Sequence, residues 1–183
     1  GDAKRDFLAT INYQSPWYKK YKYVEDHYAR LNTALTRGTP SVNVAVIHPI
    51  ESYWLHWGPA ENTALYRNML DMQFKETNEW LLSGLIDFDY ISESLLPEQA
   101  GAITEYLEVG KMRYSTVVVS GCETLRSTTL RILEKFKEAG GKIIFVGEAP
   151  KYVDAVPSKK TEELYKKCKV VMHSKSQLLS ALE

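Results

Sequence analysis

Three strand-like runs that carry apolar residues on both faces constrain this chain more than any other feature of its sequence. They are Val42 to Ile47, Tyr114 to Ser120 and Lys142 to Val146. Strands with one face in solvent alternate apolar and polar residues, whereas strands covered on both faces do not. Segments with helical periodicity separate these runs, and strands joined through helices form right-handed crossovers. The sequence therefore predicts an α/β fold with a doubly wound, mainly parallel sheet of the flavodoxin-like kind.

Further elements are expected between and after these runs. Residues 62–82 predict a helix with one apolar stripe turned inward, and residues 86–91 predict the strand that follows it. Gly110-Lys111 separates two short strand-like segments and predicts a hairpin turn. Residues 124–139 predict a helix closed by glycines, and a short helix, a small strand and a terminal helix are expected beyond Pro157. The inward stripe of the first helix is expected to consist of Leu65, Met69, Met72, Trp80 and Leu81.

The first 41 residues predict a separate N-terminal extension. Ser15 and Pro16 are typical of the N-cap and first position of a helix, and Gly38 is typical of its end. Tyrosines are unusually frequent on this amphipathic helix, which favours a neighbour that would bury them. We therefore expect an extension over residues 1–41 and an α/β domain over residues 42–183.

Charge and cysteine usage narrow the classes of partner. Lys plus Arg and Asp plus Glu number 23 each and no segment concentrates basic residues, which argues against nucleic-acid and membrane partners. Cys122 and Cys168 have no CxxC spacing, so neither a zinc site nor a disulfide framework is indicated. No apolar run reaches the roughly 18 residues of a membrane helix, and Gly1 to Arg5 lacks the apolar core of a signal peptide. The cellular compartment is left open.

The segment after the first buried strand is expected to be a loop, and it holds the candidate contact residues. In an open α/β sheet, ligands bind in the crevice beyond the carboxyl ends of the strands, which is where this segment is expected to lie. Flat aromatic side chains beside hydrogen-bonding groups suit a sugar ring, but the same residue types are enriched at protein interfaces. An interface is the favoured interpretation, with sugar contact as the alternative. The residues concerned are Glu51, Tyr53, Trp54, His56 and Trp57.

No metal or nucleotide cofactor is expected. His48, Glu51, His56 and Glu61 could be considered as a metal set, but their spacing matches no HExxH arrangement. Glycine-rich phosphate loops follow a strand and open a helix, whereas Gly140-Gly141 precedes a strand. We therefore predict neither a bound metal nor a phosphate-binding loop.

Cys122 is the candidate nucleophile if the chain is an enzyme. It follows a buried strand and precedes a segment with helical periodicity, and a helix N-terminus would lower the thiol pKa. His48 is the candidate base. Against this role, the second glycine of a nucleophile elbow is absent, and Glu123 would raise the thiol pKa. A small residue in a strand-to-helix turn capped by Thr124 is the favoured interpretation.

Four segments together resemble a known domain family. They are QSPWYKKYKYVEDHYARLNTALTRG (residues 14–38), VAVIHPIESYWLHWGP (44–59), LIDFDYISESLL (85–96) and GKMRYSTVVVSGCETLRSTTLRILEKFKEAGGKIIFVGEAP (110–150). Their order resembles the glutamine-amidotransferase-like domain inside large bacterial glycoside hydrolases of the α-L-rhamnosidase type. It is more distantly similar to the trimerisation domain of bacterial β-galactosidases.

The resemblance implies a role inside a larger protein. In such enzymes a catalytic (β/α)8 barrel precedes this domain and β-sandwich domains follow it, so residues 14–38 would correspond to the last barrel helix. The catalytic carboxylates lie in the barrel, and none is carried onto this sequence. The amidotransferase relatives use a nucleophile-elbow cysteine, a pattern from which the residues around Cys122 depart. The parent would be bacterial, and periplasmic, extracellular or cytoplasmic.

The function expected from these arguments is structural. The chain would brace the barrel or a subunit interface of a carbohydrate-degrading hydrolase, with the segment from Glu51 to Trp57 at the contact. This leaves a homo-oligomer and a glycan ligand open. One alternative is a free-standing hydrolase or amidotransferase that uses Cys122 with His48. The other is a carbohydrate-binding module that uses Trp54 and Trp57.

Overall fold

A computed structural model describes residues 12–183, and the chain divides into two compact units, Gly1–Ser41 and Val42–Glu183. The first unit contains a 3-10 turn, η1 (Tyr18–Lys20), followed by the helix α2 (Tyr21–Leu35). Trp17 is the N-cap of η1 and Lys20 that of α2, so the predicted helix start at Ser15 and Pro16 is wrong. Taken by itself, α2 exposes aromatic and aliphatic side chains, among them Tyr23 and Tyr28.

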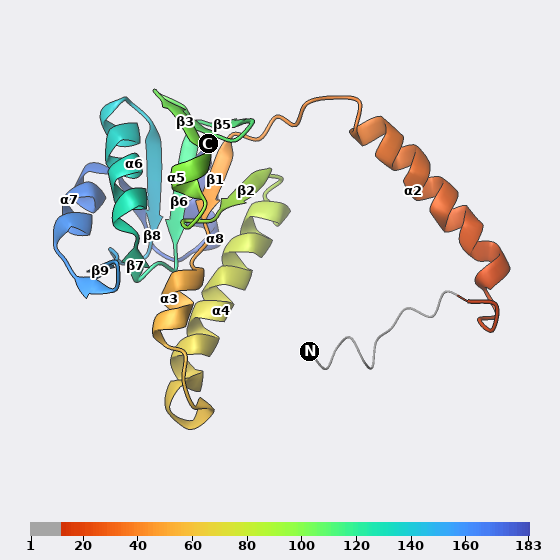
Figure 1. Ribbon diagram of the computed structural model, residues 1–183, viewed down its shortest axis with the longest axis horizontal. Helices are drawn as coiled ribbons and strands as arrows, with labels where there is room; N and C mark the ends of the chain where they lie inside the picture. Colours follow the sequence, from red (N-terminus) through yellow and green to blue (C-terminus); the bar gives the residue numbers. More distant parts are fainter. Residues whose placement is uncertain (1–11) are drawn as a thin grey trace. The chain divides into compact units, whose positions relative to one another are not determined.

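The centre of the second unit is a five-stranded parallel sheet (Figure 1). Its strands are β1 (Val44–Ile47), β2 (Phe88–Ile91), β6 (Thr116–Ser120), β8 (Lys142–Val146) and β11 (Lys169–Val171). They are arranged in the order β11-β8-β6-β1-β2, and every neighbouring pair is parallel. Numbered by their sequence in the chain, these strands run 2-1-3-4-5, which is the flavodoxin-like order. The predicted doubly wound parallel sheet is therefore confirmed.

The sheet is covered on both faces, as its apolar strands require. On one face α4 (Ala60–Ser83) and α8 (Lys175–Leu182) pack over the strands, with Leu81 and Leu178 fully buried. On the other face α6 (Ser127–Glu138) and α7 (Lys160–Lys167) do so, with Leu133 and Phe136 fully buried. Each buried apolar side chain of this size stabilises the fold by about 1.5–3 kcal/mol relative to exposure.

Two small sheets flank the central one. An antiparallel sheet is formed by β3 (Ala100–Ile103), β4 (Leu107–Val109) and β5 (Met112–Tyr114). Gly110, with a φ of 60°, forms the turn between β4 and β5, so the predicted hairpin is present. The helix α5 (Leu96–Gln99) leads into this sheet. The second small sheet lies on the side of α3 in Figure 1 and comprises β7 (Thr124–Leu125), β9 (Tyr152–Val153) and β10 (Val156–Pro157).

In the α/β domain, three local predictions are wrong. The segment from Glu51 to Trp57 is mostly helical, because α3 spans Ile50–Leu55. The helix expected from Thr124 begins at Ser127, because residues 124–125 pair with β9 and Arg126 occupies the N-cap. Thr124 therefore does not cap the helix.

The third error concerns the inward face of α4. Leu65 is 80% exposed and Met72 is 53% exposed, whereas Leu81 is buried as predicted. Leu70 and Thr77, which were not in the predicted stripe, are buried as well. The predicted stripe counted only apolar residues, whereas the face turned toward the domain carries the polar Thr77.

Within residues 12–183 no helix combines the length and the apolar character that crossing a membrane requires.

Candidate functional site

The carboxyl edge of the sheet, between β1 and β6, is the topological switch point of this fold. The chain leaves β1 toward one side of the sheet through α4 and β2, and builds the other side from β6 onward. Open α/β sheets bind ligands in the crevice at this point. His48 and Pro49 follow β1 here, and Gly121, Cys122 and Glu123 follow β6.

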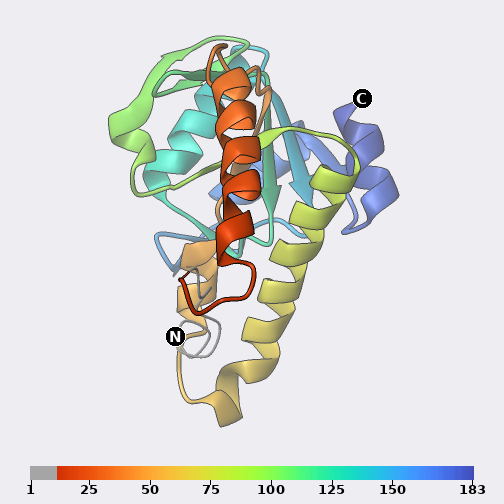
Figure 2. The same cartoon turned by 90° about the vertical axis from the view of Figure 1, so that its right-hand side faces the viewer.

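The helices α3 and α4 extend beyond this edge. A helix of the 24 residues in α4 is about 36 Å long, whereas β1 has four residues and β6 has five. The Thr77 and Ser120 hydroxyls hydrogen-bond at 2.9 Å, which joins α4 to the last residue of β6. The part of α4 before Thr77 therefore overhangs the strand ends, beside α3, as both views show (Figures 1 and 2).

Ser52 fastens α3 to the loop after β6. Its side-chain oxygen accepts hydrogen bonds from the backbone N–H groups of Glu123, at 2.9 Å, and Thr124, at 3.2 Å. Ser52 is buried, so these two donors are satisfied away from solvent. The contact joins segments about 70 residues apart, and no pattern in the sequence indicates it.

Glu51 and His56 are held in ionic and hydrogen-bonded contacts. Glu51 pairs with Arg126, at the start of α6. His56 Nε2 lies 2.7 Å from Glu123 Oε2, and its ring stacks on Tyr66 with centroids 5.1 Å apart. Both residues therefore join the α3 segment to the rest of the domain.

The two tryptophans of this segment are exposed. Trp54 is 58% exposed and Trp57 is 70% exposed. The Arg67 guanidinium lies 5.1 Å from the centroid of the Trp57 ring, an arrangement that attracts a cation to the π face. Exposed apolar residues of α4 belong to the same overhang. We call the following set the overhang surface: Trp54, Leu55, Trp57, Leu65, Met69 and Met72.

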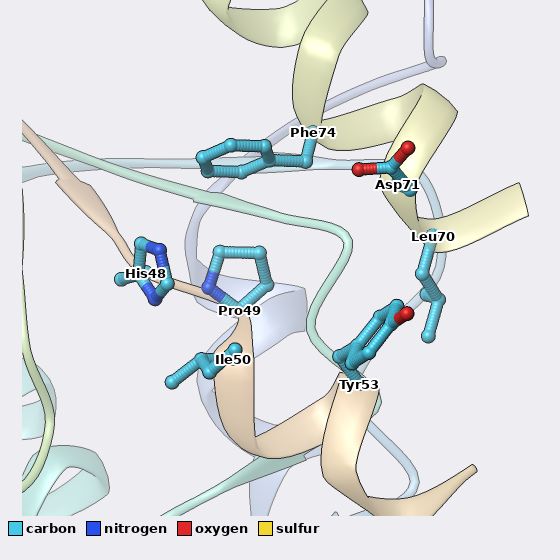
Figure 3. A pocket seen from close by; sticks show the side chains of 7 residues that line it. All are labelled: His48, Pro49, Ile50, Tyr53, Leu70, Asp71 and Phe74. Atoms are coloured by element: carbon cyan, nitrogen blue, oxygen red, sulfur yellow. The ribbon is translucent and has the colours of Figure 1, made fainter. Parts of the chain in front are cut away.

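His48 and Tyr53 line a small, mostly apolar cavity of about 190 Å³ beside α4 (Figure 3). The His48 ring meets the rings of Phe74 and Tyr90 edge-on, at 5.4 and 5.5 Å between centroids. Burial lowers the pKa of His48, which favours the neutral imidazole. Asp71, at the opposite side of the cavity, is paired with Lys75 at 2.6 Å.

Cys122 is a buried residue of the apolar core. Its thiol points to the Ser120 carbonyl at 3.6 Å, and burial raises its pKa well above the ordinary value, with the Glu93 carboxylate adding to the effect. The expected helix N-terminus is not beside it, because α6 begins at Ser127. His48 and Cys122 line different cavities. This environment disfavours the thiolate that nucleophilic chemistry would need.

A second and larger cavity, of about 330 Å³, lies on the other side of the α4 overhang. We call it the switch-point crevice. The loops after β6 and β8 form its floor, and the α4 side chains of Tyr66, Met69 and Gln73 face it. His173, which follows β11, closes one end and pairs with Glu76 at 2.9 Å. Gln73 and His173 were not identified from the sequence, because only the fold brings them together.

No cluster of three or more His, Cys, Asp or Glu side chains suited to a metal ion occurs within residues 12–183. Glu93 is a further residue that sequence patterns do not reveal. It is 3% exposed, and its carboxylate accepts a hydrogen bond of 2.8 Å from the backbone N–H of Arg126. Burial raises its pKa above the ordinary value of 4.5.

Comparisons with known proteins give one structural neighbour. No family model matches the sequence, and neither does any curated protein. Among solved structures, the chain is similar to a rhamnosidase from Novosphingobium sp. PP1Y, with 19% sequence identity and a TM-score of 0.49. The match covers 94% of this chain and 16% of the rhamnosidase chain, so the matched region is a small part of that protein.

Proposed function

We propose that this chain is a non-catalytic α/β domain of a larger bacterial glycoside hydrolase. Its overhang surface would be the contact with the catalytic barrel or with another subunit. The glycoside hydrolase part of this proposal rests on the resemblance of four sequence segments to the amidotransferase-like domain of such enzymes. The contact part rests on the geometry of α3 and α4.

The exposed overhang surface is the observation that carries the proposal. Trp54 and Trp57 come from the α3 segment, and Leu65, Met69 and Met72 follow one another at helical spacing along α4. Large apolar side chains exposed on two neighbouring elements favour an interaction site, and tryptophan is enriched among the residues that dominate interface energies. The ion pair of Glu51 with Arg126 and the hydrogen bond of His56 with Glu123 fix the α3 segment to the domain. The α3 segment, which carries the two tryptophans, is thus held in place by these contacts.

The two alternatives receive less support from the same geometry. A cysteine hydrolase or amidotransferase would need a reactive thiolate, but Cys122 is buried and its pKa is raised. A carbohydrate-binding module through the tryptophans would need open ring faces. The Arg67 guanidinium lies over the Trp57 ring, which favours a protein contact there.

Hydroxyl-radical footprinting tests the contact. The chain of 183 residues is compared with the longer product of its own coding sequence, and oxidation of each tryptophan is followed by mass spectrometry. Trp54 and Trp57 should be oxidised readily in the chain and be protected several-fold in the longer product. Trp80 is the matched control, because its ring already packs against the His173 ring, with the centroids 4.5 Å apart. The oxidation of Trp80 should therefore differ little between the two products.

Equal oxidation of Trp54 and Trp57 in both products would contradict the contact. A coding sequence without a barrel upstream would contradict the glycoside hydrolase assignment. Hydrolysis of glycosides or glutamine by the chain of 183 residues would contradict the non-catalytic role.

A further inference from the structure

The switch-point crevice exists because α4 continues where the strands stop. Tyr66, Leu70, Gln73 and Thr77 recur at helical spacing and share one face of α4. Thr77 meets Ser120, the last residue of β6, through their hydroxyls. The residues before Thr77 on the same face have no strand beneath them and cover a cavity instead.

Two glycines keep the floor of the crevice open. Gly121 follows β6 and Gly147 follows β8, with φ values of 65° and 88°, and both line the cavity. These left-handed conformations turn the chain away at the ends of the strands. A Cβ at Gly147 would meet no atom within 4 Å, and one at Gly121 would come within 3.6 Å of the Gln73 side-chain oxygen. The space between the strand ends and α4 is therefore unfilled.

The crevice offers unpaired polar groups. The Gln73 carboxamide has no hydrogen-bond partner within residues 12–183, although it is half-buried and faces the cavity. Glu123 uses one carboxylate oxygen for His56, and the other has no partner in the same part of the chain. A carboxamide both donates and accepts, and a carboxylate accepts strongly. Tyr66 and Met69 add apolar contact area at the rim.

The surroundings disfavour an anionic ligand. Phosphates in related architectures bind at the N-terminus of the helix after the strand. Here the backbone N–H groups of Arg126 and Ser127, at the start of α6, already bond to the carboxylates of Glu93 and Asp154. Within the crevice Lys151 is paired with Glu148 at 3.0 Å, which leaves Glu123 as an additional negative charge. A nucleotide or phosphate would therefore be repelled by Glu123 and would find the backbone N–H groups at the start of α6 already bonded.

We propose that the switch-point crevice binds a neutral polyhydroxylated ligand, one pyranose ring of a glycan. Vicinal hydroxyls both donate and accept, which matches the Gln73 carboxamide and the free oxygen of Glu123. The cavity of about 330 Å³ is at the small end of ligand sites. The requirement for a neutral polar ligand rests on this geometry alone. The choice of a glycan rests on the proposed function.

Titration of the chain with methyl glycosides tests the proposal. Isothermal titration calorimetry and ligand-observed NMR would be run with methyl glycosides of rhamnose, galactose and glucose, with glucuronate, and with inorganic phosphate. At least one neutral glycoside should bind, and glucuronate and phosphate should bind at least about tenfold more weakly. If no glycoside binds, or if an anion binds best, the proposal is wrong.

Three variants locate the binding. Gln73→Ala should weaken glycoside binding by about tenfold, and Asn68→Ala is the matched control because Asn68 is an exposed amide on the same helix. Glu123→Gln should weaken it similarly while reducing the discrimination against glucuronate. If Trp54→Ala abolishes binding and Gln73→Ala does not, the sugar binds to the overhang surface and the crevice proposal fails.

These outcomes are separate from those that test the proposed function. Footprinting reports on the overhang surface, and the coding sequence reports on the parent enzyme. Either can contradict the proposed function while a glycoside still binds through Gln73. Conversely, if no glycoside binds in the crevice, the protection of Trp54 and Trp57 from oxidation in the longer product is still expected.

Discussion

At the scale of single residues, the loops after β2 and β6 combine a buried thiol with a buried carboxyl. Cys122 and Glu93 are both almost fully buried, and the Glu93 carboxylate raises the cost of ionising the Cys122 thiol. Glu93 nevertheless has a structural role, because it accepts the backbone N–H of Arg126 at the N-cap of α6. The two residues therefore stabilise the packing of the loops after β2 and β6, and their surroundings do not favour a reactive thiolate.

Glu93 should make stability depend on pH. Because its pKa is raised in the folded state, the folded protein holds this proton more tightly than the unfolded chain does. The resulting stabilisation is fully present below the ordinary pKa of 4.5 and is lost as pH rises through the folded pKa. Glu93→Gln keeps an acceptor for Arg126 and should remove this loss, so the variant should gain stability relative to the parent as pH rises.

Urea denaturation from pH 4 to pH 8 measures the effect. Glu93→Ala is the comparison, because it leaves the Arg126 donor unpaired and should be less stable than Glu93→Gln by about 1–3 kcal/mol at all these pH values. A constant free-energy difference between Glu93→Gln and the parent across this range would contradict the prediction.

At the scale of elements, α3 is a short helix that depends on tertiary contacts. Six residues are too few for a stable helix in water without tertiary contacts. Ser52 supplies one of these contacts through two backbone donors of the loop after β6. The ion pair of Glu51 with Arg126 and the hydrogen bond of His56 with Glu123 supply the others. The position of Trp54 and Trp57 thus depends on the buried side chain of Ser52.

Ser52→Ala should loosen α3. The N–H groups of Glu123 and Thr124 would lose their acceptor in a buried place, which should cost about 1–3 kcal/mol of unfolding free energy. Hydrogen exchange of these two amides should accelerate in the variant. Ser94→Ala is the control, because Ser94 is exposed and, among residues 12–183, its side chain bonds only to the Ser92 hydroxyl. Unchanged exchange at Glu123 and Thr124 would show that Ser52 does not hold the helix.

At the scale of the whole α/β domain, α4 serves two purposes along its length. The part after Thr77 packs on the sheet through Leu81, whereas the part before Thr77 leaves the sheet and carries Leu65 and Met72 in solvent. The crevice and the overhang surface both follow from this excess of helix over strand. A helix matched to the strands would have neither.

Substitutions at the two ends of α4 should separate these purposes. Leu65→Lys and Met72→Lys should change the unfolding free energy by no more than about 0.5 kcal/mol, because both side chains are exposed. Leu81→Ala should cost about 2–5 kcal/mol, because Leu81 is fully buried. Guanidinium denaturation measures all three. A loss above about 2 kcal/mol at Leu65 or Met72 would mean that the overhang is part of the core.

The sequence alone determined the class of fold and the order of its elements. The runs at β1, β6 and β8 are apolar on both faces, and that property is local, so it predicts a covered parallel sheet without knowledge of any partner. The aromatic residues of the α3 segment could likewise be identified, and their position at the carboxyl edge follows from the end of β1. Local periodicity and turn chemistry were sufficient for these features.

Tertiary structure alone decided which face of α4 turns inward, where α6 begins and what surrounds Cys122. Each depends on contacts between distant segments, such as Thr77 with Ser120, Glu93 with Arg126 and Ser52 with Glu123. Polar side chains such as Thr77 and Gln73 can face the domain when a partner or a cavity receives them, and a pattern that counts apolar residues assigns them to solvent. The reason is physical, because burial of a polar group is governed by its hydrogen-bond partner, and that partner is set by the fold.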